Sequence, residues 1–101
     1  MSYEIVVTDR KTAESPEDAF KTMPVLKPDD TVTQEQINAL NAAYPMVWDT
    51  KIVMDQIIMN NTFPSKEEYD ARKSDPLIKN LQAKRQAWAE ANKLTFDIRV
   101  L

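Results

Sequence analysis

Three residue types are absent from this 101-residue sequence: cysteine, histidine and glycine. Without cysteine the chain has no disulfide, no thiolate nucleophile and no thiolate metal ligand. Without histidine it has no imidazole base and lacks the usual ligand set for zinc. Without glycine it has no P-loop, no dinucleotide-binding fingerprint and no nucleophile elbow. Tight turns and helix ends must therefore use Asn, Asp and Pro, with Asn60-Asn61, Asp29-Asp30 and Asn92 as candidates.

The remaining composition is that of one small globular domain, residues 1–101. Charged residues make up 29% of the chain and apolar residues 43%, a normal globular balance. No charged-then-apolar leader follows Met1, and no apolar run approaches the roughly 18–20 residues that a membrane span requires. We therefore expect a cytoplasmic protein with no membrane association, or a virion protein if the source is a virus.

Both ends of the chain have strand patterns. Residues 2–8 form a β-branched run, and in residues 94–101 the side chains of Leu94, Phe96, Ile98 and Val100 alternate with polar ones. Two strands at opposite ends of a chain most simply pair with each other. Such a pair is marginal in water, so helices must cover one of its faces, and we expect the four alternating residues on the covered face.

The middle of the chain carries helix signals. Ser15-Pro16 begins a short helix that ends before Pro24, and Thr33 with Gln36 is a capping box for a helix that ends before Pro45. Ser65 with Glu68 is a second capping box, for a helix ending near Lys73. Ser74-Asp75-Pro76 caps a last helix over about 76–92, and Asn92 is its expected C-terminal cap.

Residues 46–59 are apolar on three sides when placed on a helical wheel, interrupted only by Asp49, Lys51, Asp55 and Gln56. A buried strand over 51–59 is an alternative, but the length of the run favours a helix. Such a helix is either a central core helix or has one face against another subunit or a partner. The predicted fold class is therefore α+β, with four or five helices packed on a small antiparallel β pair formed by the N- and C-terminal strands.

No group of residues points to catalysis, a metal or a cofactor. Glu67, Glu68 and Asp70 lie near the start of a predicted helix, where acids stabilise the helix dipole without any further role. Asp29-Asp30 lacks the spacing and the glycine of a calcium loop. Three of the serines are expected at helix caps, and no histidine is available to activate a hydroxyl. The sequence thus predicts no enzyme, no catalytic residue, no metal site and no cofactor.

By this elimination, the leading hypothesis is a non-catalytic protein-interaction or assembly module that self-associates or docks on a protein partner. A compact acidic domain of this length is typical of small viral, phage-type structural or accessory proteins. The interface residues that the apolar patterns indicate are Trp48, Ile52, Met54, Ile57, Met59, Phe96 and Ile98.

The alternative is a small regulator that binds nucleic acid, or a nucleic-acid enzyme, through a basic helix face. Its candidate residues are Lys79, Gln82, Lys84 and Arg85, because basic and amide side chains contact phosphates and base edges. The net charge of −3 opposes this alternative, since nucleic-acid-binding domains are usually basic. We therefore expect a protein partner or a homo-oligomer in preference to nucleic acid.

Overall fold

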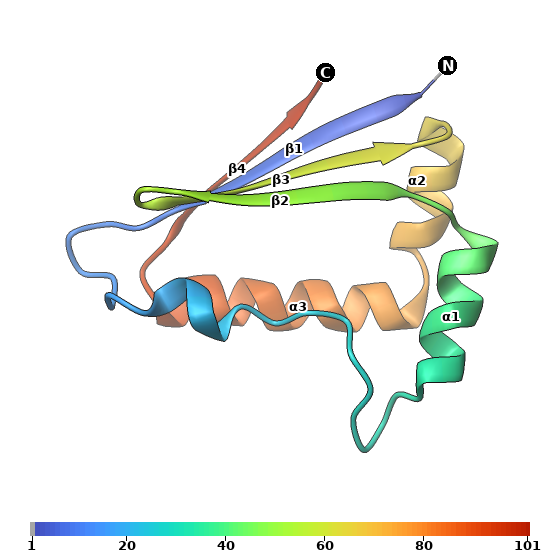
Figure 1. Cartoon of the computed structure of the whole chain (residues 1–101), viewed down its shortest axis with the longest axis horizontal. Helices are drawn as coiled ribbons and strands as arrows, with labels where there is room; N and C mark the ends of the chain where they lie inside the picture. The colour runs from blue at the N-terminus through green and yellow to red at the C-terminus, as the bar shows by residue number, and fades with distance from the viewer. Residues whose placement is uncertain (1) are drawn as a thin grey trace.

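The computed structural model describes residues 2–101 as a four-stranded antiparallel sheet with helices on one side (Figure 1). The strands are β1 (Tyr3–Arg10), β2 (Val47–Val53), β3 (Gln56–Phe63) and β4 (Thr95–Val100), in the order β2-β3-β1-β4. The helices are α1 (Gln34–Ala43), α2 (Lys66–Lys73), α3 (Pro76–Ala91) and a short 3-10 helix, η1 (Ala19–Thr22). Within residues 2–101 no helix is long and apolar enough to cross a membrane.

The predicted pairing of the terminal strands is confirmed, but the predicted numbers of strands and helices are wrong. Strand β1 pairs with β4 from Ile5–Val100 to Arg10–Thr95, and its other edge pairs with β3. The terminal strands are therefore half of a four-stranded sheet and do not form a β pair of their own. Among the described residues there are three α-helices, where four or five helices were expected.

The difference comes from residues 46–59, which form a β-hairpin and not a helix. Strand β2 pairs with β3 from Val47–Thr62 to Val53–Gln56, and the chain reverses at Met54 and Asp55. Such hairpins are normally recognised from Asn-Gly or Asp-Gly in the turn. This chain has no glycine, and Met54 adopts the positive φ of 56° itself. The hairpin was missed because its turn carries no turn residue at that position.

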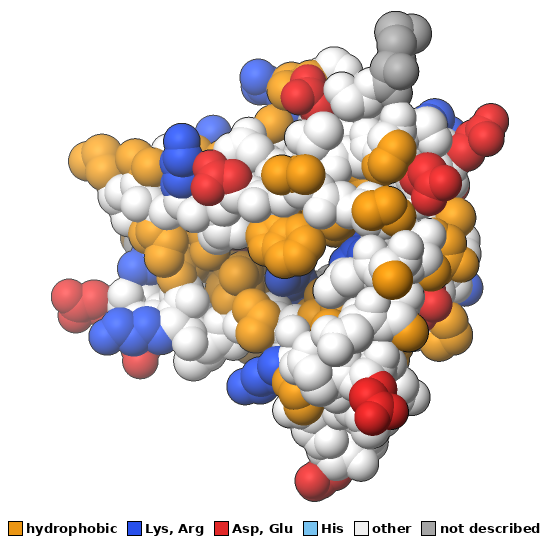
Figure 2. All heavy atoms as spheres, turned by 45° about the vertical axis from the view of Figure 1, so that its right-hand side comes forward, with side chains coloured by type: hydrophobic (Ala, Val, Ile, Leu, Met, Phe, Trp, Pro, Cys, Tyr) orange, Lys and Arg blue, Asp and Glu red, His pale blue; other side chains and the backbone are white. Residues whose placement is uncertain are grey.

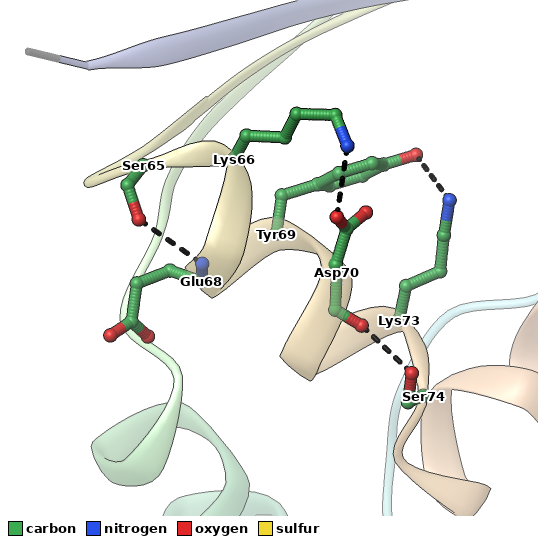
Figure 3. Close-up of polar contacts among 7 residues, drawn as sticks. All are labelled: Ser65, Lys66, Glu68, Tyr69, Asp70, Lys73 and Ser74. Carbon is green, nitrogen blue, oxygen red and sulfur yellow. Dashed lines mark hydrogen bonds and ion pairs between the residues drawn. The ribbon is translucent and has the colours of Figure 1, made fainter.

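The helix ends follow the predicted caps more closely. Thr33 and Gln36 form both bonds of a capping box at the start of α1. The Ser65 hydroxyl accepts a hydrogen bond from the Glu68 amide at 3.2 Å, which confirms Ser65 as the N-cap of α2 (Figure 3). Asp75 caps α3 with Pro76 as its first residue, and Asn92 is its C-cap. The segment after Ser15 is helical only over the short η1.

One side of the sheet faces the helices, and aromatic contacts identify it. The Tyr69 ring of α2 packs on Tyr3 and Phe63, with ring centroids 5.4 and 4.9 Å apart. Because side chains alternate along a strand and directly paired residues share a face, the whole helix-facing side follows from the register. It includes the buried residues Ile5, Asp9, Ile57, Met59 and Phe63. As Figure 1 shows, the opposite side is covered by no helix of residues 2–101.

The helices cover the two central strands and leave the edges of the sheet exposed. On β4, the side chains of Phe96, Ile98 and Val100 lie on the helix-facing side of the sheet but remain 60, 50 and 53% exposed. The expectation that these side chains are buried is therefore wrong, although the strand itself is correct. The buried residues on this side lie on the central strands β1 and β3, and the helices leave the edge strand β4 uncovered.

Replacing Ser65 with alanine should destabilise the protein by about 1 kcal/mol, because the Glu68 amide would lose its acceptor at the start of α2. Urea denaturation at neutral pH measures this change. Ser2→Ala, at an exposed position before β1, is the control and should leave the midpoint unchanged. An unchanged midpoint for Ser65→Ala would mean that the cap contributes nothing.

Replacing Met54 with asparagine should stabilise the protein by about 0.5–1 kcal/mol, because asparagine tolerates a positive φ better than methionine does. The methionine side chain is 91% exposed, so little packing is lost. Met54→Ala is the control, since alanine shares the steric cost of a positive φ and should leave stability nearly unchanged. Equal denaturation midpoints for the asparagine and alanine variants would contradict this account of the turn.

Candidate active site between the sheet and the helices

Asp9 is an acidic residue buried between β1 and the helix layer. It lies on the helix-facing side, is 4% exposed, and follows Ile5 and Val7 on that face. Burial raises the pKa of its carboxyl group, and the positive charge of Arg85 lowers the pKa by a smaller amount. Within residues 2–101 this carboxylate has no ion pair. A desolvated acid without a partner destabilises a fold, and such groups cluster at functional sites.

Arg85 of α3 lies opposite Asp9 and is held by the chain that follows η1. The Trp88 indole donates to the carbonyl oxygen of Ala19 at 2.9 Å, which fixes η1 against α3. The Arg85 Nε atom donates at 2.9 Å to the carbonyl oxygen of Pro24, just beyond η1. Burial lowers the pKa of Arg85 and the charge of Asp9 raises it, but a guanidinium stays protonated in proteins. Its terminal nitrogens carry donors that no residue of the described chain accepts.

Asp9 and Arg85 influence each other's charge without forming an ion pair. Two opposite charges that lie near each other without touching can both contact a polar molecule placed between them, as they can contact a bridging water. An anionic oxygen would satisfy the free donors of Arg85, while the carboxylate of Asp9 could accept a proton. The arrangement is therefore suited to removing a proton from a small molecule and stabilising the negative charge that results.

A buried guanidinium belongs to Arg72, in the last turn of α2. Arg72 is 8% exposed, and its Nη1 atom donates at 2.9 Å to the carbonyl oxygen of Tyr44 at the end of α1. Burial lowers its pKa, and the charge of Asp75 partly compensates. One turn earlier in α1, the side-chain oxygen of Asn41 is buried and has no hydrogen-bond partner within residues 2–101. Unpaired polar groups thus occur at two places in the helix layer.

The space beneath the sheet opens at the β2 edge. Figure 2 shows a hollow below the sheet, with hydrophobic side chains at its rim and blue, basic side chains in its depth. On β2, Trp48 and Ile52 lie on the helix-facing side of the sheet. They are 57 and 61% exposed, because the helices do not reach this strand. We call the space between this edge and the helices the inner hollow. Its rim supplies apolar and aromatic contacts, and Asp9 of β1 and Arg85 of α3 lie between the same sheet and helices.

A separate, open depression of about 540 Å³ lies where the loop after β1 meets the end of α3. Its polar atoms largely bond one another, since the Thr12 and Ser15 hydroxyls both donate to the carbonyl oxygen of Lys93, at 2.8 and 3.1 Å. These bonds close the end of the domain, and within residues 2–101 no buried side-chain polar atom at this end lacks a hydrogen-bond partner. We therefore place the candidate site in the inner hollow.

The structure separates the residues that the sequence grouped as an interface. Ile57 and Met59 are core residues, 2 and 6% exposed. Trp48 and Ile52 lie at the β2 edge, Met54 at the tip of the hairpin, and Phe96 and Ile98 at the β4 edge. All except Met54 lie on the helix-facing side of the sheet, but the helices cover its centre, so the exposed residues lie at two separate edges.

The predicted nucleic-acid face is also divided. Lys79, Gln82 and Lys84 are exposed on α3, and Lys84 lies 4.0 Å from Asp29. Arg85 points inward to Pro24 and Asp9. Binding of nucleic acid through the three exposed residues stays a prediction.

Two residues of the site were missed from the sequence. Asp9 carried a signal, because it continues the Tyr3, Ile5, Val7 alternation onto the buried face of β1. Arg72 carried none, because its burial depends on how the end of α1 meets α2.

No family model and no curated protein matches the sequence. Solved structures share the fold at low sequence identity. A conserved protein of unknown function from Bacteroides thetaiotaomicron, described as a possible oxidoreductase, has a TM-score of 0.62 at 12% identity, over 99% of this chain and 95% of its own. An antibiotic biosynthesis monooxygenase has a TM-score of 0.59 at 9% identity, over 98 and 95% of the two chains. A dimeric ferredoxin-like protein from an uncultured marine organism has a TM-score of 0.56 at 16% identity, over 100 and 91%.

These similarities correct the functional predictions. The chain has a ferredoxin-like fold, and the comparable structures include a monooxygenase and a possible oxidoreductase. The predictions of a non-catalytic assembly module, of a viral structural protein and of no enzyme activity are therefore wrong. They rested on the absence of Cys, His and Gly chemistry, which left Asp9 and Arg85 unexamined as a pair.

Replacing Asp9 with asparagine should raise stability at neutral pH and leave it nearly unchanged in acid. The folded protein holds the Asp9 proton more tightly than the unfolded chain, so wild-type stability falls as pH rises from the usual aspartate pKa, about 3.9, through the raised value. Asparagine carries no charge to bury and escapes this loss. Urea denaturation of both proteins at pH 7 and below pH 3.9 measures the difference, and equal stability at pH 7 would contradict the desolvated state of Asp9.

Proposed function

We propose that this protein is an enzyme that oxidises a small organic molecule bound in the inner hollow. The observation that carries the proposal is the buried Asp9 carboxylate beside the half-buried Arg85 guanidinium, two opposite charges that form no ion pair. Their placement beneath a ferredoxin-like sheet supports the same class of reaction as the monooxygenase of this fold.

Each group has a chemical task in this proposal. Asp9 accepts a proton from an acidic O–H or C–H bond of the substrate, and its raised pKa makes it a stronger base than an exposed aspartate. Arg85 stabilises the resulting oxyanion through the donors on its terminal nitrogens. The electron-rich anion then reacts with dioxygen: one oxygen atom replaces two hydrogens of the substrate as a carbonyl oxygen, and the other leaves with those hydrogens as water. Trp48 at the rim packs against the ring or apolar body of the substrate.

Oxygen uptake with a panel of phenols, hydroquinones and β-diketones tests this function. Asp9→Asn should lower the rate by about 10²–10⁴-fold and Arg85→Gln by about 10²–10³-fold. Lys84→Gln is the matched control, because Lys84 is the neighbour of Arg85 on α3 but is exposed. Full activity in both site variants, or no uptake with any panel member while the fold is intact, would reject the proposal.

We also propose that the protein is a homo-oligomer. The similar protein from the marine organism is dimeric, and several large apolar side chains of this chain are exposed on its sheet. Mass by light scattering over a range of concentrations tests this, and a monomer at the highest concentration would contradict it.

A further inference from the structure

The uncovered side of the sheet is a continuous surface formed by all four strands. It consists of the even-numbered residues of β1 and the residues paired with them on β3, then β2, and on β4. We call this surface the open face. Figure 1 shows no helix of residues 2–101 over it. Antiparallel sheets can expose one face to water, and such a face is then polar throughout.

The open face is not polar throughout. Near its centre, Thr8 is only 8% exposed and its neighbours Val6 and Ile58 are half-buried. At its corners, Val47 and Leu101 are 71 and 69% exposed, and Leu101 continues β4 through a 2.9 Å bond from its amide to the carbonyl oxygen of Glu4. Apolar groups therefore reach from one edge of this face to the other.

The two edge strands of the open face carry charges in complementary order, and the central strand β1 adds the exposed Glu4 and Arg10. Edge strand β2 carries Asp49 and Lys51, and edge strand β4 carries Asp97 and Arg99. The register places Lys51 in line with Asp97, through Ile58 and Thr8.

The same register places Asp49 in line with Arg99, through Asn60 and Val6, and Val47 in line with Leu101, through Thr62 and Glu4. Two cross-sheet rows thus end in an acid and a base and a third ends in two apolar residues, while the fourth, through Gln56 and Arg10, ends in Val53 and Thr95.

We propose that the open face binds a second copy of this chain, with a two-fold axis parallel to the strands and between β3 and β1. Rotation about this axis lays β2 of each copy over β4 of the other and keeps the rows aligned. Lys51 then meets Asp97 of the second copy, Asp49 meets Arg99 of the second copy, and Val47 meets Leu101 of the second copy. Facing sheets pack in this way about 10 Å apart, with their strands within about 30° of one another.

This inference rests on the proposed homo-oligomer and is independent of the proposed enzyme activity. It identifies which surface associates, because the exposed apolar residues on the helix-facing edges, such as Ile52 and Phe96, offer no such pairing of charges.

Sedimentation velocity of the full chain over a range of concentrations tests the open face. Val53→Lys, on the open face, should weaken the dimer at least tenfold. Ile52→Lys is the matched control, because it is the adjacent residue on the other side of the same strand and is similarly exposed, 61% against 46%. The control should leave the dimer intact. The opposite pattern, with Ile52→Lys breaking the dimer and Val53→Lys leaving it, would overturn the proposal.

Charge reversal tests the alignment. Lys51→Asp and Asp97→Lys should each raise the dissociation constant roughly tenfold, because each change creates two like-charge contacts in the symmetric dimer. The double variant should return it to near the wild-type value. Rescue of Lys51→Asp by Asp49→Lys, and not by Asp97→Lys, would overturn the axis proposed here. A wild-type protein that stays monomeric would overturn both the oligomer and its interface, while oxygen uptake is measured separately.

Discussion

The hydrogen bonding of β1 on both of its edges is the interaction on which the rest of this domain depends. Strand β3 pairs with one edge and β4 with the other, and β2 is attached only through β3. The helix layer packs on residues that β1 and β3 contribute, with Ile5, Ile57, Met59 and Phe63 as its buried sheet residues. The position of Asp9 follows from the same strand, because parity along β1 directs this residue toward α3.

A domain of this size covers one face of its sheet and no more. Helices α1, α2 and α3 all lie on one side, and they leave the edge strands exposed even there. Two features follow from this shortage of covering chain. The space under the β2 edge stays open to solvent, and basic side chains lie in its depth. The other face of the sheet has no intramolecular cover, so its apolar and charged residues can contact only water or another molecule.

The parts of the fold that the sequence predicted are those set by local chemistry. The helix caps are local: the side-chain oxygens of Ser65, Asp75 and Thr33 accept hydrogen bonds from backbone amides within three residues, and Gln36 completes the capping box with Thr33. The terminal strands were recognised by alternation, which is equally local. The hairpin was not, because its turn depends on Met54 in a conformation that the residue type does not favour. Its apolar residues also satisfy helical spacing, so periodicity alone could not separate the two structures.

The candidate site could be predicted less well, because it depends on contacts between distant segments. Arg85 was predicted as part of a basic helix face, but it turns inward to the Pro24 carbonyl group, 61 residues earlier in the chain. Asp9 could have been predicted from the alternation of side chains along β1, which places it on the buried face. Arg72 reaches the Tyr44 carbonyl group, 28 residues earlier, only when the end of α1 meets α2.

The central position of β1 has a consequence for folding. Its partners come much later in the sequence, with Tyr3 opposite Phe63 and Ile5 opposite Val100. Pairings this distant are slow to form, because a long loop must close before they contribute. Any intermediate that lacks β4 leaves the run Ile5-Val6-Val7 with a bare edge of unpaired amides and carbonyls, which is a template for strands of other chains. The strand that organises the native sheet is therefore also the segment most exposed to aggregation while the chain folds.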